Sequence, residues 1–170
     1  MSSEVKKIKG SSATKSGSLL VVNMRGLVNT RTPVKTTLEQ LYIARRFNAT
    51  IVPDTEAYRG MLRLSKEHVA WCKITADVAE KLLSKRSEKS TGVRYLEADL
   101  KNSKEFNSFG ELAKALELGN VNLSHLDLMR PFFRLNPPKG GFRKSTRRQH
   151  SDNGILGHNE DLTRYVEKML

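Results

Sequence analysis

Hydrophobic positions in residues 18–75 alternate between the period of a β-strand and the period of an α-helix. Residues 18–25 (SLLVVNMR) form a nearly continuous apolar run of strand length, as expected for a central strand of a sheet. Further strands are predicted over 49–52 and 68–75, where apolar residues again dominate. Alternation along the first strand predicts two faces, with Leu20, Val22 and Met24 on one and Leu19, Val21, Asn23 and Arg25 on the other.

Two amphipathic helices are predicted between these strands. The first begins at Thr32-Pro33, an N-cap followed by the first helical position, where proline costs no hydrogen bond. Its core face comprises Val34, Leu38, Leu41 and Tyr42. The second follows a cap at Asp54 or Thr55 and has a core face of Ala57, Met61 and Leu64. The order β-α-β-α-β predicts an α+β fold with a ferredoxin-like split β-α-β core, in which right-handed crossovers place both helices on one side of the sheet.

The rest of the chain is predicted to add four parts to the core of residues 18–75. Residues 1–17 form a basic arm rich in serine and lysine, which we expect to be disordered in isolation. Residues 76–129 form a helical extension, residues 130–154 a basic extended segment, and residues 155–170 a C-terminal helix.

Capping signals mark the helices of these added parts. A helix opens at Thr75 and Asp77, and Ser108 with Glu111 has the spacing of a capping box that begins another. The second of these helices ends at Gly119, a residue that favours the left-handed conformation of a helix terminus. The C-terminal helix is capped by Asn159 and has an apolar face of Leu162, Val166 and Met169.

Charge is distributed unevenly along the 170 residues, whose net charge is +12. Residues 130–148 hold seven cations and no acid, and residues 1–25 hold five cations and one acid. Residues 26–129 are nearly balanced, with sixteen cations and thirteen acids. Basic segments that flank a balanced core favour a nucleic-acid partner over a membrane surface.

The composition also excludes several classes of protein. No run of apolar residues approaches the roughly 20 that a membrane span requires, and residues 1–17 lack the apolar part of a signal peptide. The single cysteine, Cys72, excludes a disulfide framework and a cysteine-based zinc site. We therefore expect a cytoplasmic protein with no membrane partner, no cofactor and no metal.

A row of cations marks the second helix of the core. Arg59, Arg63 and Lys66 recur at helical spacing, although like charges at this spacing repel by a few tenths of a kcal/mol. Gly60 lies among them, where glycine costs roughly 1 kcal/mol relative to alanine and permits the close approach of another backbone. A phosphate chain satisfies both features, whereas a merely solvated charged face is the alternative.

Two further groups of residues are candidates for phosphate contact. Arg25 lies at the exit of the first strand, while Arg31 and Lys35 oppose the dipole at the start of the first helix unless a phosphate binds there. In the basic segment, two prolines favour extended chain and cations alternate with phenylalanines. This composition suits threading through folded RNA, with a disordered basic linker as the alternative. Its candidate RNA-binding residues are Arg130, Arg134, Lys139, Gly140, Gly141, Phe142, Arg143, Lys144, Arg147 and Arg148.

The block from Val52 to Met61, VPDTEAYRGM, is the most specific of several segments that occur together in one known family. The others are Met24-Arg-Gly, Thr37-Leu38, Leu135-x-Pro-Pro-x-Gly-Gly141 and the acidic start of the C-terminal helix. Together they resemble the universal large-subunit ribosomal protein thirty, in its longer archaeal-type form related to eukaryotic ribosomal protein L-seven. The resemblance extends from about Ser18 to Leu170, and the short bacterial form would end near Thr75.

The resemblance implies a structural constituent of the large ribosomal subunit that binds large-subunit ribosomal RNA, contacts neighbouring ribosomal proteins and supports translation. The chain departs from the family pattern at Asn136 and Lys139, where histidine and arginine are usual, and at Cys72, where glycine is common. Lys139 keeps the charge but not the bidentate fork of arginine. Residues 1–17 have no clear counterpart in the family.

Two other functions compete with this interpretation. Arg25 and Arg31 could serve an acylphosphatase-like enzyme, but the four histidines are scattered and no nucleophile–base pair or metal-ligand spacing is present. We therefore expect no small-molecule substrate. A free RNA-binding regulator or assembly protein is the second alternative. An RRM version of it would need several exposed aromatic residues on its strands, and Trp71 is the one available.

Overall fold

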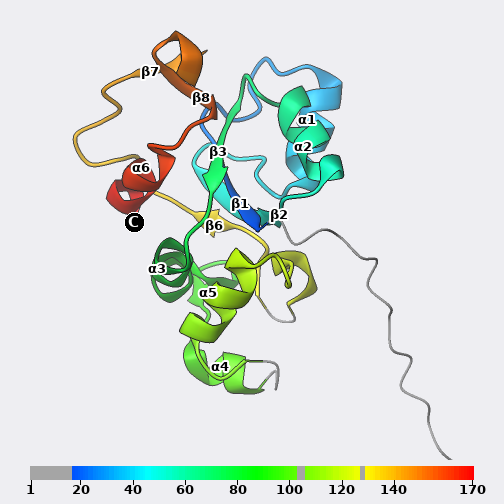
Figure 1. Ribbon diagram of the computed structural model, residues 1–170, viewed down its shortest axis with the longest axis vertical. Helices are drawn as coiled ribbons and strands as arrows, with labels where there is room; N and C mark the ends of the chain where they lie inside the picture. Colours follow the sequence, from blue (N-terminus) through cyan, green and yellow to red (C-terminus); the bar gives the residue numbers. More distant parts are fainter. Residues whose placement is uncertain (1–16, 103–105, 127–128) are drawn as a thin grey trace, which may run out of the picture.

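Six strands form one mixed sheet through the middle of the protein, in the order β6-β2-β1-β3-β8-β7 (Figure 1). The structure is a computed structural model that describes residues 17–102, 106–126 and 129–170, with the backbone alone at 101 and 102. The predicted disordered arm, apart from Gly17, lies outside these residues. The strands are β1 (Ser18–Asn23), β2 (Asn48–Pro53), β3 (Val69–Lys73), β6 (Phe133–Arg134), β7 (Ser145–Gln149) and β8 (Gly154–His158).

The split β-α-β arrangement predicted from the sequence is confirmed. Strand β1 pairs antiparallel with β2 on one side and with β3 on the other, so β2 and β3 run parallel with β1 between them. Helix α2 (Glu56–Leu64) connects these two parallel strands. Helix α1 (Thr32–Gln40) connects β1 to β2, which are antiparallel neighbours. The sequence analysis expected both helices to lie in crossover connections, whereas only the α2 connection joins parallel strands of this core.

Two hydrophobic clusters cover the two faces of the sheet, as the alternation along the strands predicted. Leu20, Val22 and Met24 belong to the cluster that includes α3 (Ala76–Arg86), α5 (Phe109–Glu117) and α6 (Leu162–Met169). Leu19 and Val21 belong to the other cluster, with Leu38 of α1 and Leu62 of α2. All five of these strand side chains are at most 5% exposed. The sheet is therefore apolar on both faces, which explains the continuous apolar run in β1.

The predicted ends and faces of α1 and α2 need correction. Helix α1 is capped by Arg31 instead of Thr32, and Tyr42 lies beyond its end, 49% exposed and with a positive φ of 59°. In α2 the buried residue is Leu62, with Tyr58 and Met61 packed beside it, whereas Ala57 and Leu64 are exposed. Thr55 is the N-cap of α2, as predicted, and its side chain accepts a hydrogen bond from the Tyr58 backbone N–H at 3.5 Å.

The part of the chain from α3 to α5 is largely helical and lies at one end of the molecule, at the bottom of the view (Figure 1). Helices α3 and α5 pack together, and α5 is capped by Ser108, whose hydroxyl accepts from the Glu111 N–H at 3.3 Å. This confirms the capping signal, and Gly119 has the expected positive φ of 72°. The extension predicted as helical over 76–129 also contains a hairpin of β4 (Glu88–Ser90) and β5 (Val93–Arg94), followed by α4 (Glu97–Asn102). A short helical turn, η1 (Leu123–His125), follows α5.

The last forty or so residues contribute three strands that the sequence pattern did not predict. Strand β6 pairs with β2, and β8 pairs in parallel with both β3 and β7. A helical turn, η2 (His150–Asp152), separates β7 from β8. Helix α6 has the predicted apolar face, since Leu162, Val166 and Met169 are all buried. Its N-cap is Asp161, whereas Asn159, predicted as the cap, is a buried residue of the preceding turn.

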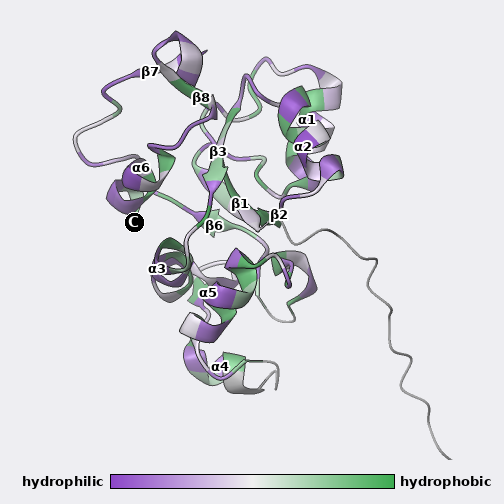
Figure 2. Ribbon diagram, in the orientation of Figure 1, coloured by the Kyte–Doolittle hydropathy of each residue, from purple (hydrophilic) through white to green (hydrophobic). Residues whose placement is uncertain are grey.

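None of the helices in the described residues is both long and apolar enough to cross a membrane. Hydrophilic residues are drawn along much of β7 and the outer sides of α1 and α2 (Figure 2).

Candidate nucleic-acid interface

A cleft of about 320 Å³ lies between the turn at 139–143 and helix α6. Its lining combines cations, glycine backbone and one aromatic ring: Lys139, Gly140, Gly141, Arg143, Asp161, Arg164, Tyr165 and Lys168. The turn comes from the segment predicted to bind RNA, and the opposite wall comes from the C-terminal helix. Two stretches that the sequence analysis treated separately therefore form one site.

Backbone contacts hold the turn against the end of α6. The N–H of Asn136 donates to the Met169 carbonyl at 3.1 Å, and the N–H of Lys139 donates to the Lys168 carbonyl at 3.3 Å. Gly140 and Gly141 both have positive φ, 82° and 70°, a conformation that side chains with a Cβ adopt at a cost. These glycines reverse the chain and leave their own backbone open to the cleft.

Aromatic packing fixes the floor of the turn. The ring of Phe142 lies 6.0 Å from the ring of Phe47 and 5.6 Å from the ring of Tyr165, measured between centroids. These distances are typical of favourable tilted aromatic pairs. Phe142 was predicted to contact RNA, but its ring is partly buried against the core, so we assign it to anchoring the turn.

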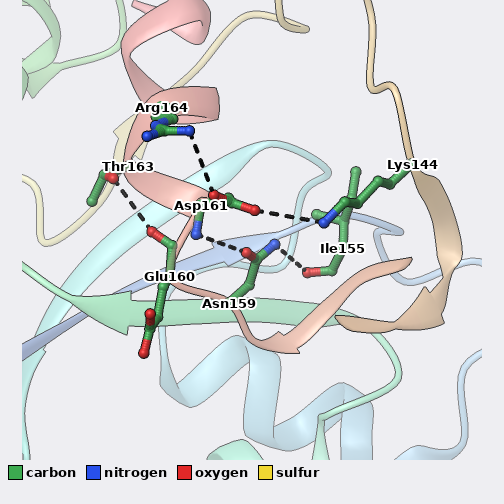
Figure 3. A network of polar contacts seen from close by, with 7 residues as sticks. All are labelled: Lys144, Ile155, Asn159, Glu160, Asp161, Thr163 and Arg164. Carbon is green, nitrogen blue, oxygen red and sulfur yellow. Dashed lines mark hydrogen bonds and ion pairs between the residues drawn. The ribbon is translucent and has the colours of Figure 1, made fainter. Parts of the chain in front are cut away.

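A polar network sets the position of the other wall, at the start of α6 (Figure 3). The buried side chain of Asn159 donates to the Ile155 carbonyl at 3.1 Å and accepts from the Asp161 N–H at 2.9 Å. The Asp161 carboxylate lies 3.5 Å from Lys144 Nζ and 3.9 Å from Arg164. Lys144, predicted to contact RNA, thus links the basic segment to α6.

The charge of the cleft is strongly positive. Lys139, Arg143, Arg164 and Lys168 are exposed cations, and Asp161 is the single acid in the lining. Asp161 is already shared by Lys144 and Arg164, while Lys139, Arg143 and Lys168 form no ion pair within the described part of the chain. An arrangement of this kind attracts anions, and the open glycine backbone allows the close approach of a phosphodiester chain.

The predicted cations of α2 are arranged differently from the expectation. Arg59 is bound to Asp54, whose carboxylate it meets with Nε at 2.5 Å and Nη2 at 2.7 Å. The Asp54 side chain is only 3% exposed, so Arg59 serves the fold whether or not it also contacts RNA. Arg63 and Lys66 are exposed, and so is Gly60, where an added Cβ would meet no atom within 4 Å.

Replacing Arg59 with alanine should lower the melting temperature at neutral pH, because it leaves the buried Asp54 carboxylate without its guanidinium. The hydrogen bonds from Arg59 hold the pKa of Asp54 below its usual value, against the opposing effect of burial. The stabilisation is therefore fully present above the unfolded pKa of about 3.9 and is lost as pH falls through the lower folded pKa. Thermal unfolding from pH 7 down to pH 2 should show the two proteins converging in acid.

Arg63→Ala is the matched control, one turn further along the same exposed helix side and without a buried carboxylate partner in the described residues. Its melting temperature should follow that of the parent at every pH. An Arg59→Ala variant with parental stability at pH 7 would contradict the assigned role of the pair.

Gly60→Ala should raise the free energy of unfolding by about 1 kcal/mol, because Gly60 is helical and the new methyl group meets open space. If an RNA backbone lies against α2 at this point, the same variant should bind RNA more weakly. Urea unfolding and a filter-binding assay on one preparation measure both effects. Ala57→Gly, at an exposed position of the same helix, controls for helix propensity and should lose about the same stability without a gain or loss of affinity.

The remaining predicted cations of the core lie near the loop between α2 and β3. Arg25 donates from Nη1 to the Glu67 carbonyl at 3.3 Å, and Gln149, at the end of β7, donates to the Lys66 carbonyl at 3.4 Å. This loop therefore brings Arg25, Lys66 and the end of the basic strand together. Arg31 and Lys35 are exposed at the start of α1.

The predicted cations outside the cleft differ in their freedom to bind a partner. Arg147 and Arg148 are exposed on β7, at the edge of the sheet. Arg134 is half-buried on β6. Arg130 is engaged within the protein, where Nη2 lies 2.9 Å from the Thr91 hydroxyl and Nη1 lies 3.8 Å from the Glu88 carboxylate.

Four residues of the cleft lining were absent from the sequence-based prediction of RNA contacts: Asp161, Arg164, Tyr165 and Lys168. A signal for two of them exists, since Arg164 and Lys168 are four residues apart and share one side of the predicted C-terminal helix. From the sequence alone, these two cations cannot be distinguished from solvent-exposed cations of an ordinary amphipathic helix that begins with acidic residues. What identifies them as part of the cleft is the contact between the 139–143 turn and this helix in the folded protein.

The chain is similar in sequence to several archaeal proteins of the large ribosomal subunit. The chain is 35% identical over 153 residues to the large ribosomal subunit protein uL30 of Korarchaeum cryptofilum, covering 89% of this chain and 94% of that protein. It is 35% identical over 154 residues to the protein of the same name from Cenarchaeum symbiosum, covering 91% and 99%. It is 37% identical over 139 residues to the uL30 protein of Nanoarchaeum equitans, covering 81% of this chain and 88% of that protein. No family model matches the chain.

Proposed function

Because the chain belongs to the uL30 family of large ribosomal subunit proteins, we propose that it is a structural constituent of the large subunit of the cytoplasmic ribosome. In this role it binds large-subunit ribosomal RNA, lies against neighbouring ribosomal proteins and supports translation. The cleft between the 139–143 turn and α6 is the observation that carries the RNA-binding part of the proposal.

The charge and the rigidity of the cleft both support this role. Four exposed cations surround backbone that is open to a ligand, and each can release counterions from a phosphate chain. The turn and α6 are held together by hydrogen bonds and by the Phe47, Phe142 and Tyr165 rings. A preformed site avoids part of the entropy cost of ordering side chains on binding. Strands β6 and β7 hold the basic segment on either side of this turn, which favours a preformed site over a free linker.

We assign the protein a binding role and not a catalytic one. The relatives are named as proteins of the large ribosomal subunit, which supports a structural role. Arg25, the candidate for a phosphate-handling enzyme, has its guanidinium against the Glu67 carbonyl. The test is hydrolysis of acyl phosphate by purified protein: a rate above buffer that disappears in Arg25→Ala would overturn this assignment.

Sedimentation of a native cell extract tests the ribosomal role. The protein should migrate with large subunits in a gradient, remain with them when magnesium is removed to separate the subunits, and leave them only in high salt. Recovery at the top of the gradient would favour the free regulator or assembly protein. Migration with small subunits would contradict both.

A further inference from the structure

A second cavity, of about 260 Å³, lies on the opposite face of the sheet from α6. Helix α2 forms one wall, and strands β1, β3 and β8 contribute the other lining residues, apart from Asp54 just before α2. The lining residues divide into an apolar part, Leu19, Leu62 and Trp71, and a polar rim, Asp54, Arg59, Arg63, Lys73 and His158. No residue of this cavity belongs to the cleft described above.

Trp71 is the centre of the apolar part. Its neighbours across the sheet are Val21 on β1 and His158 on β8, so the indole lies on the face that α2 only partly covers. The side chain is packed against the buried cluster of that face, yet it remains partly exposed. A partly exposed indole that lines the pocket together with Leu19 and Leu62 gives a ligand an aromatic, apolar contact.

The rim gives this surface a positive border. Asp54 is the single acid, and it is held by Arg59 in a two-pronged pair at 2.5 and 2.7 Å. That pair also fixes the guanidinium of Arg59 at the edge of the cavity. Arg63 and Lys73 are exposed on opposite sides of the opening, one from α2 and the other from β3. A ligand with an apolar ring and an attached anion matches this combination.

We propose that this pocket receives one unstacked base of an RNA chain, stacked on Trp71, with the adjoining phosphates on Arg63 and Lys73. The inference rests on the proposed RNA-binding function and adds a base contact to the phosphate contacts of the cleft. Every base presents a π face, so such a contact tolerates different sequences. An aromatic side chain from a neighbouring protein would match the indole but not the cationic rim.

Trp71 is the only tryptophan of the chain, so its fluorescence reports directly on the pocket. A short single-stranded oligoadenylate should quench the emission of the full-length protein to saturation. An abasic oligonucleotide of the same length and charge should bind through the cations without quenching. Binding of both is followed independently by the anisotropy of a label on the oligonucleotide.

Variants separate the stacking contact from general charge. Trp71→Leu should weaken oligoadenylate binding by about 5- to 150-fold, the range for one base–aromatic stack, and leave abasic binding unchanged. Arg63→Ala keeps the indole and should shift the quenching curve to higher oligoadenylate concentration. If Trp71→Leu does not fold, as judged by circular dichroism, the quenching experiment on the parent and on Arg63→Ala still decides.

Equal quenching by both oligonucleotides, or saturated binding without quenching, overturns the pocket inference. Quenching by other ribosomal proteins but not by RNA overturns it in favour of a protein partner. These results are independent of the sedimentation test. A protein that migrates with large subunits but shows no quenching disproves the pocket alone, whereas quenching by a protein absent from subunits disproves the ribosomal role alone.

Discussion

Replacing Lys139, Arg143, Arg164 and Lys168 together with glutamine should lower the salt slope of RNA binding by about three units, if each cation neutralises one phosphate. All four side chains are exposed around one cleft, so a single RNA chain can meet them together. Titrations across a range of salt concentrations yield the slope, and the affinity loss should be largest at low salt. Glutamine keeps length and polarity, so the fold should persist.

The control replaces Lys85, Arg94 and Lys114 with glutamine, three exposed cations of the helical extension. For each cation replaced, the salt slope of RNA binding should change far less in this control than in the cleft variant. A second comparison replaces Arg143, Lys144, Arg147 and Arg148, the cations that the sequence alone favours. The salt slope of this set should fall less than that of the cleft set, because Arg147 and Arg148 lie on β7, outside the lining of the cleft. Equal slopes for the cleft variant and the control would refute the cleft as the main phosphate site.

Phe133→Ala should lower the free energy of unfolding by about 3–5 kcal/mol, the usual cost of deleting a fully buried aromatic side chain. Phe133 is 0% exposed, belongs to the larger hydrophobic cluster and pairs with Ala49 across β6 and β2. Urea unfolding at equilibrium measures the change. An unchanged m-value would show that the denatured state is unaffected.

The neighbouring residue is a matched control for this substitution. Phe132 is half-buried, and its ring lies 5.7 Å from the Arg130 guanidinium instead of in the core. Phe132→Ala should therefore cost about 1 kcal/mol or less. If the two variants lose equal stability, β6 does not anchor the basic segment to the sheet in the way described.

The core could be predicted from the sequence because both faces of its strands are apolar. In β1 the two sets of side chains separated by alternation belong to two different clusters, and the same is true of Val69 and Cys72 on β3. The capping signal at Ser108 predicted the start of α5 for a local reason, since the cap depends on residues of the same turn.

Strands β6, β7 and β8 could not be predicted because their pairing depends on distant partners. Strand β6 has two residues, and β7 has the sequence STRRQ, with no hydrophobic alternation to indicate a sheet. Strand β8 is short and contains two glycines. Strands β6 and β8 form because β2 and β3 offer free edges for hydrogen bonding, and β7 then pairs with β8. These edges are a property of the folded sheet.

The face of α2 was predicted wrongly for a related reason. Residues 58, 62 and 65 have the same helical spacing as the predicted core face of 57, 61 and 64. Residue 65 is a serine, however, and a polar residue argues against a core face. Ser65 is in fact 0% exposed, and its hydroxyl donates to the Met61 carbonyl at 2.8 Å. A serine whose hydroxyl is hydrogen-bonded within its own helix can be buried. A pattern of polar and apolar residues cannot predict this, because it counts every serine as exposed.

Crosslinking by ultraviolet light in native large subunits, with mass spectrometry of the peptides attached to RNA, tests the central claim most directly. The claim is that the cleft between the basic turn and α6 holds ribosomal RNA. Crosslinked nucleotides should occur on both walls, in peptides from 139–149 and from 161–170. Crosslinks confined to the α3–α5 extension, with both walls of the cleft free of RNA, would contradict it.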